Sequence, residues 1–372
     1  MPWSLEKILR GARKLNASDI HLTRGVAPVV RIHGEIQFIH GEPLDDATLR
    51  RLLDEMLPPK QREIFEERWQ LCFSRYFEGV GRCRTSIYYH ASVPEMAIRL
   101  CESSIRTDTE LGLPAVIDEL TRLTSGLVLI TGPTGSGKTT TLNYMIDAIN
   151  QNRRAKIVTI EDPVEYVHHN LRSIIIQQEV QTDVKTFREA LVHVLRQDPD
   201  IVVIGEMRDL ETIETALTAA ETGHLVLATL HTPDAVQTVQ RIYSVFPAEQ
   251  QNAIVVQLSS VLQAVIAQQL LPRADGSGRV LATEVLVTTP AVRTHIRERK
   301  EHLCYNEMQT GKKYQMQTMD NALLELYQRG DITYDAALTR CRDPNHLRRR
   351  TGQPVDEQFP SETATRLAHP RL

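Results

Sequence analysis

Residues 126–139 of the 372-residue chain read GLVLITGPTGSGKT. The first six residues form an uncharged run with β-branched members, which is typical of a buried strand. The last eight match the pattern G-x-x-x-x-G-K-[ST] in full, and we expect a helix to begin near Lys138. A strand, a glycine-rich turn and a helix in this order predict a loop that binds the phosphates of a nucleoside triphosphate.

The residue types in this loop suit a phosphate. Glycines let the backbone curl so that consecutive N–H groups face one anion, and the following helix adds the positive end of its dipole. We expect Lys138 to bridge the β- and γ-phosphates of ATP and the Thr139 hydroxyl to hold Mg²⁺. A turn that matches by chance is the alternative, and the flanking strand and helix argue against it. The residues expected to bind the nucleotide are Gly132, Pro133, Thr134, Gly135, Ser136, Gly137, Lys138, Thr139 and Thr140.

Around the loop, apolar strand-like runs alternate with helical patterns. The runs cover residues 127–131, 156–161, 174–177, 201–205 and 225–230. Such alternation predicts an α/β domain with a mainly parallel sheet that is covered on both faces. Gly223 follows a predicted helix over 210–222, where a left-handed C-terminal turn is expected. The longest uncharged stretch, 254–271, is interrupted by glutamines and serines and predicts a packed helix rather than a membrane span.

Before this domain the pattern is different. Short strands over 29–32, 37–39 and 84–89 mix with helices over 46–57 and 59–69, which predicts a small α+β domain at residues 1–102. Residues 103–112 lose periodicity and are the predicted linker. The nucleotide-binding domain with its C-terminal helices is predicted to run over 113–345. The remainder, 346–372, has no apolar periodicity and is predicted to be disordered.

The composition bounds the class of protein. There are 43 Lys and Arg against 47 Asp and Glu, a net charge of −4, with 41% hydrophobic residues, as in soluble globular proteins. That balance excludes a chain built to coat nucleic acid. The five cysteines are scattered, without metal-binding spacing, and the N-terminus lacks the apolar block of a secretion signal, so we expect a cytoplasmic protein without a transmembrane segment.

Acidic residues follow two of the predicted strands. The strand at 201–205 leads into Glu206, but Gly205 stands where a metal-holding aspartate is usual, so Glu206 is expected to act on water. The strand at 156–161 leads into the acidic box (residues 161–165). Its carboxylates Glu161, Asp162 and Glu165 could enter the shell of Mg²⁺. The alternative for each acid is a solvated loop charge.

Two histidines and three arginines are further candidates. His224 and His231 flank the strand at 225–230, too far apart for a shared metal, and His231 is either a sensor of the γ-phosphate or a core histidine. Arg82, Arg84 and Arg99 flank short strands of the first domain. They are either solvated or stabilise the charge of phosphoryl transfer when another domain or subunit delivers them.

Several motifs together are similar to those of one family. They lie at residues 19–22, 132–141, 160–165, 198–209, 220–226, 229–232, 290–297 and 316–320. Their order over residues 5–345 resembles the PilT-type ATPases of the secretion ATPase superfamily, which power retraction of type IV pili. The resemblance implies a PAS-like N-terminal domain, a RecA-like ATPase domain and ATP bound between them.

The resemblance also implies roles for single residues. Glu165 matches the acidic box of the family, Glu206 its catalytic glutamate, and His224 and His231 its histidine box. The three arginines fall where N-terminal arginines of the family approach the nucleotide. Residues 290–297 resemble a segment needed for retraction rather than for hydrolysis.

The assembly that the resemblance implies is a homo-hexamer at the inner membrane. It would act from the cytoplasmic side on a PilC-like platform protein and, through it, on pilin. Whether the chain matches PilT or its paralogue PilU stays open. Pilus-assembly and type II secretion ATPases are alternatives, although the chain lacks their extra N-terminal domain and four-cysteine loop. A nucleic-acid translocase, disfavoured by the charge, and a scaffold that binds nucleotide without hydrolysis are the remaining classes.

Overall fold

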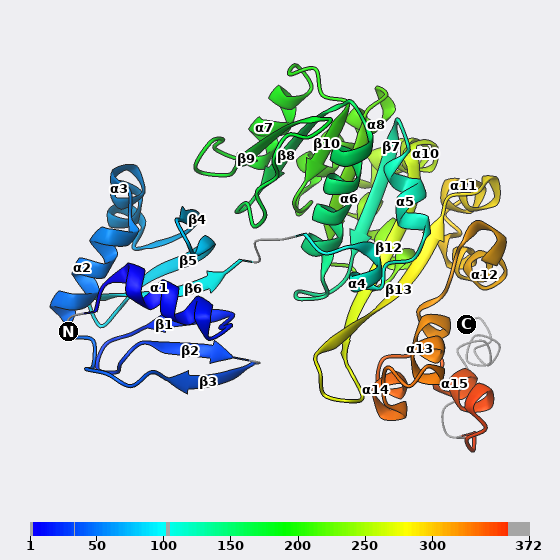
Figure 1. Cartoon of the computed structure of the whole chain (residues 1–372). Helices are drawn as coiled ribbons and strands as arrows, with labels where there is room; N and C mark the ends of the chain where they lie inside the picture. Colours follow the sequence, from blue (N-terminus) through cyan, green and yellow to red (C-terminus); the bar gives the residue numbers. More distant parts are fainter. Residues whose placement is uncertain (1–2, 33, 102–104, 356–372) are drawn as a thin grey trace. The chain divides into compact units, whose positions relative to one another are not determined.

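The computed structural model describes residues 3–32, 34–101 and 105–355 (Figure 1). These residues form two compact units. The first comprises the described part of Met1–Ile105 together with Glu161–His169 and Gln177–Lys185. The second comprises Arg106–Ile160, Asn170–Ile176 and the described part of Thr186–Leu372. Two segments that lie within the ATPase part of the sequence therefore belong by their contacts to the first unit.

The first unit is built on a six-stranded antiparallel sheet with the order β3-β2-β1-β6-β5-β4. Its strands are β1 (Asp19–Leu22), β2 (Val29–Ile32), β3 (Glu35–Phe38), β4 (Gln70–Phe77), β5 (Gly81–His90) and β6 (Val93–Leu100). Its helices are α1 (Leu5–Lys14), α2 (Asp46–Met56) and α3 (Pro59–Arg68). Helix α1 buries Leu5, Ile8, Leu9 and Ala12 on one face, because they recur every three or four residues. The expected α+β architecture is confirmed.

The second unit is built on a seven-stranded sheet with the order β13-β12-β7-β11-β10-β8-β9. Four neighbouring pairs from β12 to β8 are parallel, and β12 pairs with β13 antiparallel. The strands are β7 (Gly126–Thr131), β8 (Lys156–Glu161), β9 (Ile174–Glu179), β10 (Ile201–Ile204), β11 (Leu225–Leu230), β12 (Leu262–Pro272) and β13 (Arg279–Val287). The mainly parallel sheet expected from the sequence is confirmed.

Helices cover both faces of this sheet. Every residue of β7 and β11 is buried, as a central parallel strand requires. On one face Val128 and Ile130 pack with Met145 and Ile149 of α6 (Lys138–Asn152). Helix α8 (Leu210–Glu221) contacts β7 and β11 as well. It ends before Gly223, whose φ of 102° is the left-handed turn that was expected.

The other helices of the second unit pack around its sheet or form its C-terminal part (Figure 1). They are α4 (Asp108–Leu111), α5 (Val116–Thr121), α7 (Phe187–Val194), α9 (Ala235–Ser244), α10 (Ala248–Val261), α11 (Pro290–Arg297), α12 (Cys304–Thr310), α13 (Met319–Gln328), α14 (Tyr334–Leu338) and α15 (Pro344–Thr351). A separate core joins the β12–β13 hairpin to α13–α15 through residues such as Leu271, Val280, Leu323 and Leu347.

Two expectations need correction. The stretch 254–271 is not one helix, because α10 ends at Val261 and β12 begins at Leu262. Pairing of β12 with β7 and β13 outweighs the local helical pattern. The disordered tail was predicted to begin at residue 346, but residues 346–351 belong to helix α15. The side chain of its N-cap, Asp343, accepts a hydrogen bond from His346 N. Residues 356–372 lie outside the described residues. No helix of the described part is both long and apolar enough to span a membrane.

The predicted linker, 103–112, also contains structure. Residues 102–104 lie outside the described residues, and the division between the two units falls at residues 105 and 106. Helix α4 follows inside this interval. It begins with a capping box in which Thr107 and Glu110 exchange hydrogen bonds, and it ends at Gly112 in the left-handed conformation.

Candidate active site

Three parallel strands of the second unit end side by side, and each leads into a predicted site residue. Strand β7 leads into the glycine-rich loop, β11 into His231, and β10 through Gly205 into Glu206. The register pairs Leu230 with Thr131 and Ile204 with Ala228, so these carboxyl ends share one edge of the sheet. This edge is where α/β proteins commonly bind ligands.

The loop backbone has the conformation that its glycines allow. A Cβ on Gly132, whose φ is 139°, would lie 2.4 Å from the carbonyl oxygen of Gln268, so only glycine fits there. Helix α6 begins directly after the loop, and its N-cap is Gly137, which has no side chain that could accept from the N–H groups of the first turn. In the described residues the buried hydroxyl of Ser136 also has no hydrogen-bond partner. The loop therefore presents polar groups that an anion could satisfy.

Lys138, His231 and Glu206 form one hydrogen-bonded line. The Lys138 ammonium is buried and donates to the carbonyls of Gly132 at 2.8 Å and Pro133 at 3.0 Å. It lies 3.4 Å from His231 Nδ1, and His231 Nε2 lies 3.0 Å from Glu206 Oε1. A neutral ring with its proton on Nε2 satisfies both neighbours, since it accepts from the ammonium and donates to the carboxylate.

Glu206 is held in its ionised form. Partial burial alone would raise the pKa of this carboxyl, but hydrogen bonds and charge from Arg208, with a smaller effect of His231, bring the pKa below its ordinary value. Arg208 Nε and Nη2 each lie 2.7 Å from a different oxygen of Glu206. Burial lowers the pKa of Lys138, and the Glu206 carboxylate partly offsets that effect.

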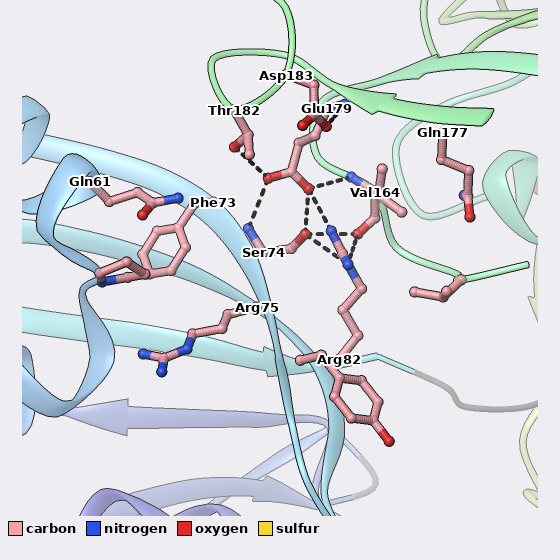
Figure 2. A pocket seen from close by; sticks show the side chains of 13 residues that line it. Gln61, Phe73, Ser74, Arg75, Arg82, Val164, Gln177, Glu179, Thr182 and Asp183 are labelled. Carbon is pink, nitrogen blue, oxygen red and sulfur yellow. Dashed lines mark hydrogen bonds and ion pairs between the residues drawn. The ribbon is translucent and has the colours of Figure 1, made fainter.

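The acidic box and two of the arginines meet in the first unit. Arg82 pairs with Glu179 of β9 at 2.7 Å, and Arg84 pairs with Glu165 at 3.2 Å. Figure 2 shows Arg82 and Ser74 pointing toward Glu179 beside Val164. These side chains line a pocket of about 430 Å³, which also includes Phe73 and Arg75 of β4.

The remaining candidates contact residues outside the line of Lys138, His231 and Glu206. Arg99 pairs with Asp19 at 2.9 Å on the first unit, and His224, at the opposite end of β11 from His231, contacts Thr222 and the Ala219 carbonyl. Glu161 accepts from Gln177 Nε2 at 3.0 Å. Thr139 and Thr140 lie half-buried in the first turn of α6. Within the described ranges, no three acids, histidines or cysteines gather as a metal-binding group.

Sequence reasoning missed two residues of these sites. Arg208 lies two positions after Glu206, and this short spacing from a strand-terminal acid was a usable signal. Glu179 gave no such signal, because its partners Ser74 and Arg82 are about one hundred residues away in the sequence.

Comparison with known proteins agrees with this geometry. A family model described as "Type II/IV secretion system protein" matches residues 97–365. The type IV pilus retraction ATPase PilT of Pseudomonas aeruginosa is 42% identical over 343 residues, which cover 92% of this chain and 99% of that protein. The type IV pilus ATPase PilU of the same organism is 39% identical and covers 92% of this chain and 90% of its own length.

A solved structure is similar over the same extent. The crystal structure of the pilus retraction motor PilT with bound ADP superposes with a TM-score of 0.87 and 45% sequence identity. The superposition covers 93% of this chain and 99% of the other. The similarity in architecture and in sequence therefore extends across both units.

Proposed function

Because this chain belongs to the type II/IV secretion system protein family, we propose that it is an ATPase whose hydrolysis of ATP to ADP and phosphate powers retraction of type IV pili. One observation carries the proposal. The Lys138 ammonium, the His231 ring and the Glu206 carboxylate lie in one hydrogen-bonded line beside a glycine loop and the uncapped start of α6.

The loop residues have the groups that bind a triphosphate. The backbone N–H groups of the loop and of the first turn of α6 would bind the β-phosphate, helped by the Ser136 hydroxyl. Lys138 would exchange the carbonyls of Gly132 and Pro133 for β- and γ-phosphate oxygens, since all these acceptors suit an ammonium. This exchange would couple nucleotide binding to the shape of the loop.

Glu206 and His231 would act on the attacking water. The ionised Glu206 would accept a hydrogen bond from the water and orient it, while Arg208 keeps the carboxylate charged. His231 contacts both Glu206 and Lys138, so its ring would report the position of the γ-phosphate to the glutamate. His224, at the far end of β11, would act only through the strand or a neighbouring subunit.

The groups that we propose for Mg²⁺ are oxygen donors, which this ion prefers. Thr139 offers a hydroxyl in the first turn of α6, and the acidic box offers the carboxylates of Glu161, Asp162 and Glu165. Mg²⁺ commonly takes one or two protein ligands together with the phosphates of a nucleotide. When bound, the ion would neutralise charge on the phosphate oxygens.

The assembly we propose is a homo-hexamer on the cytoplasmic side of the inner membrane. Its partner there would be a PilC-like platform protein, and through it pilin, without nucleic acid. The chain covers 99% of the length of PilT and 90% of that of PilU, which supports a motor of this kind. Arg84 and Arg99 would meet the nucleotide of the same or a neighbouring subunit.

Two substitutions test the activity. Lys138→Ala should reduce the affinity for Mg·ATP at least a hundredfold, and Glu206→Gln should keep that affinity while turnover falls at least a hundredfold. Nucleotide titration and steady-state phosphate release measure the two effects. Lys312→Ala, on an exposed lysine, is the matched control. Near-normal turnover of the Glu206→Gln protein would show that Glu206 has no part in the mechanism. Twitching motility in a strain that carries Lys138→Ala would contradict the proposed role in pilus retraction.

A further inference from the structure

Glu179, at the end of β9, has a carboxylate that is almost completely buried and fully hydrogen-bonded. Its side chain is 4% exposed. Oε2 lies 2.6 Å from Ser74 Oγ, 2.7 Å from Arg82 Nη2 and 3.1 Å from Val164 N. Oε1 lies 3.0 Å from Thr182 Oγ1. A buried carboxylate needs this many donors to offset the loss of water.

The same cluster holds the backbone of the acidic box. Val164 lies inside the box, directly before Glu165, and both its polar backbone groups are engaged. Its N–H donates to Glu179, and its carbonyl accepts from Arg82 Nε at 2.6 Å. Ser74 Oγ lies 3.0 Å from that carbonyl. The position of Glu165 is therefore fixed from β4 and β5 of the first unit.

Arg82 is committed to this cluster. Its side chain is 20% exposed, and it donates to a carboxylate, a carbonyl and a hydroxyl at once. To reach a phosphate it would have to leave Glu179 as a buried charge without a countercharge, which is strongly unfavourable. Arg84 differs, because its side chain is 37% exposed and its ion pair with Glu165 is 3.2 Å long.

We propose that Glu179 is a positioning residue of the ATPase, and that Arg82 serves with it as a clamp on the acidic box rather than as a ligand of the nucleotide. The inference rests on the proposed ATPase function and assigns different roles to Arg82 and Arg84. Arg82 and Glu179 place the box, and Arg84 with Glu165 is the pair that remains free to face the nucleotide.

A double-mutant cycle on the full chain tests the clamp. Arg82→Ala, Glu179→Ala and the double variant are each expected to lower kcat by a similar factor of at least ten, because each removes the same clamp. The affinity for ADP should change less than threefold in all three. Hydrogen exchange at residues 161–169 should become at least tenfold faster, which a lost phosphate contact would not produce.

Opposite results would overturn the clamp. If Arg82 binds the nucleotide, Arg82→Ala lowers ADP affinity more than tenfold, and the double variant loses the product of the two single effects. Glu179→Gln keeps the shape of the side chain and covers the case in which an alanine variant does not fold; its hydrogen exchange should rise by a smaller factor. Glu66→Gln breaks an exposed ion pair of the same unit and is the matched control. If the wild-type protein does not hydrolyse ATP, the proposed function is wrong. Hydrogen exchange at residues 161–169 tests the clamp independently of that result.

Discussion

Glu206 illustrates how neighbouring side chains set the chemistry of a single residue. Its carboxylate is partly buried, yet a guanidinium with two hydrogen bonds and an imidazole ring keep its pKa below the ordinary value. Such a carboxylate is a weak base that orients water well at neutral pH and stores no proton. The residues around Glu206 thus suit positioning of water more than full proton abstraction.

Arg208 should set the acid limit of turnover. Arg208→Gln removes the main influence that lowers the pKa of Glu206, so that pKa rises and the acid limb of kcat/KM moves to higher pH. Turnover recorded from pH 4 to 8 measures the shift. Arg188→Gln, which breaks the exposed pair with Glu211, should leave the limb in place. An unmoved limb in the Arg208 variant would show that another group controls it.

Gly132 is expected to contribute to the stability of the fold as well as to nucleotide binding. Alanine at this position meets the Gln268 carbonyl at 2.4 Å and adopts an unfavourable φ, so we expect a loss of about 3 kcal/mol or more in the free energy of unfolding. Gly135→Ala is the matched control, since no atom lies within 4 Å of its added Cβ and its φ of 79° costs about 1–2 kcal/mol. Urea unfolding without nucleotide compares the two, and equal losses would contradict the steric argument.

At the scale of elements, two helices of the second unit begin at one buried carboxylate. Glu284 of β13 accepts from Ala235 N in the first turn of α9 at 2.8 Å and from Met319 N in the first turn of α13 at 3.4 Å. Burial raises the pKa of this carboxyl to about 7, although both N–H groups act against the rise. Helix α9 follows His231 closely, so this carboxyl links the active-site edge to the C-terminal helices.

The raised pKa of Glu284 predicts a pH-dependent stability. The folded protein holds the proton up to about pH 7, whereas the unfolded chain releases it near 4.5, so stability falls as pH rises between these values. Relative to Glu284→Gln, the wild type should lose roughly 3 kcal/mol from pH 5 to pH 8. Urea midpoints at both pH values measure the difference. Glu325→Gln, on exposed α13 surface, should run parallel to the wild type, and a Glu284→Gln protein that also does so would contradict the prediction.

Elements differ in how far the sequence alone could predict them. The bounds of β8, β11 and α6 follow from apolar runs and the glycine loop, because those patterns are local. Strand β12 did not follow, since its alternation is weak and only pairing with β7 and β13 makes it a strand. The line of Lys138, His231 and Glu206 could be predicted from the sequence, because each residue follows a parallel strand. The contacts of Glu179 could not be predicted, because they depend on which distant segments of the sequence meet in the first unit.

At the scale of the whole molecule, the two units do not follow the order of the chain. The acidic box and residues 177–185 belong by contacts to the first unit, although the phosphate-binding loop belongs to the second. Candidate catalytic groups are therefore divided between the two units, and the predicted linker alone does not reveal this division. ATP can favour one arrangement of the two units only if it binds that arrangement more tightly than another.

Assembly into rings should be visible with a protein that binds ATP without turnover. Glu206→Gln with Mg·ATP should sediment at six times the subunit mass, since bound nucleotide would stabilise the assembly. Lys138→Ala, whose affinity for Mg·ATP is expected to be at least a hundredfold lower, should show a smaller fraction of that species under the same conditions. Wild-type turnover per subunit that is constant down to concentrations where only monomer sediments would contradict a ring motor.

One ribbon of the second unit runs from the nucleotide edge to the far C-terminal helices. Gln268 of β12 has its carbonyl against Gly132 and its side chain on Thr141 at 2.7 Å, while Leu271, three residues later, is buried in the core of α13–α15. As far as Ala267 the strand pairs with both β7 and β13, and beyond that residue it pairs with β13 alone. Because Gln268 and Leu271 lie three residues apart on one strand, a change at the phosphate-binding loop has a short covalent path to the C-terminal helices.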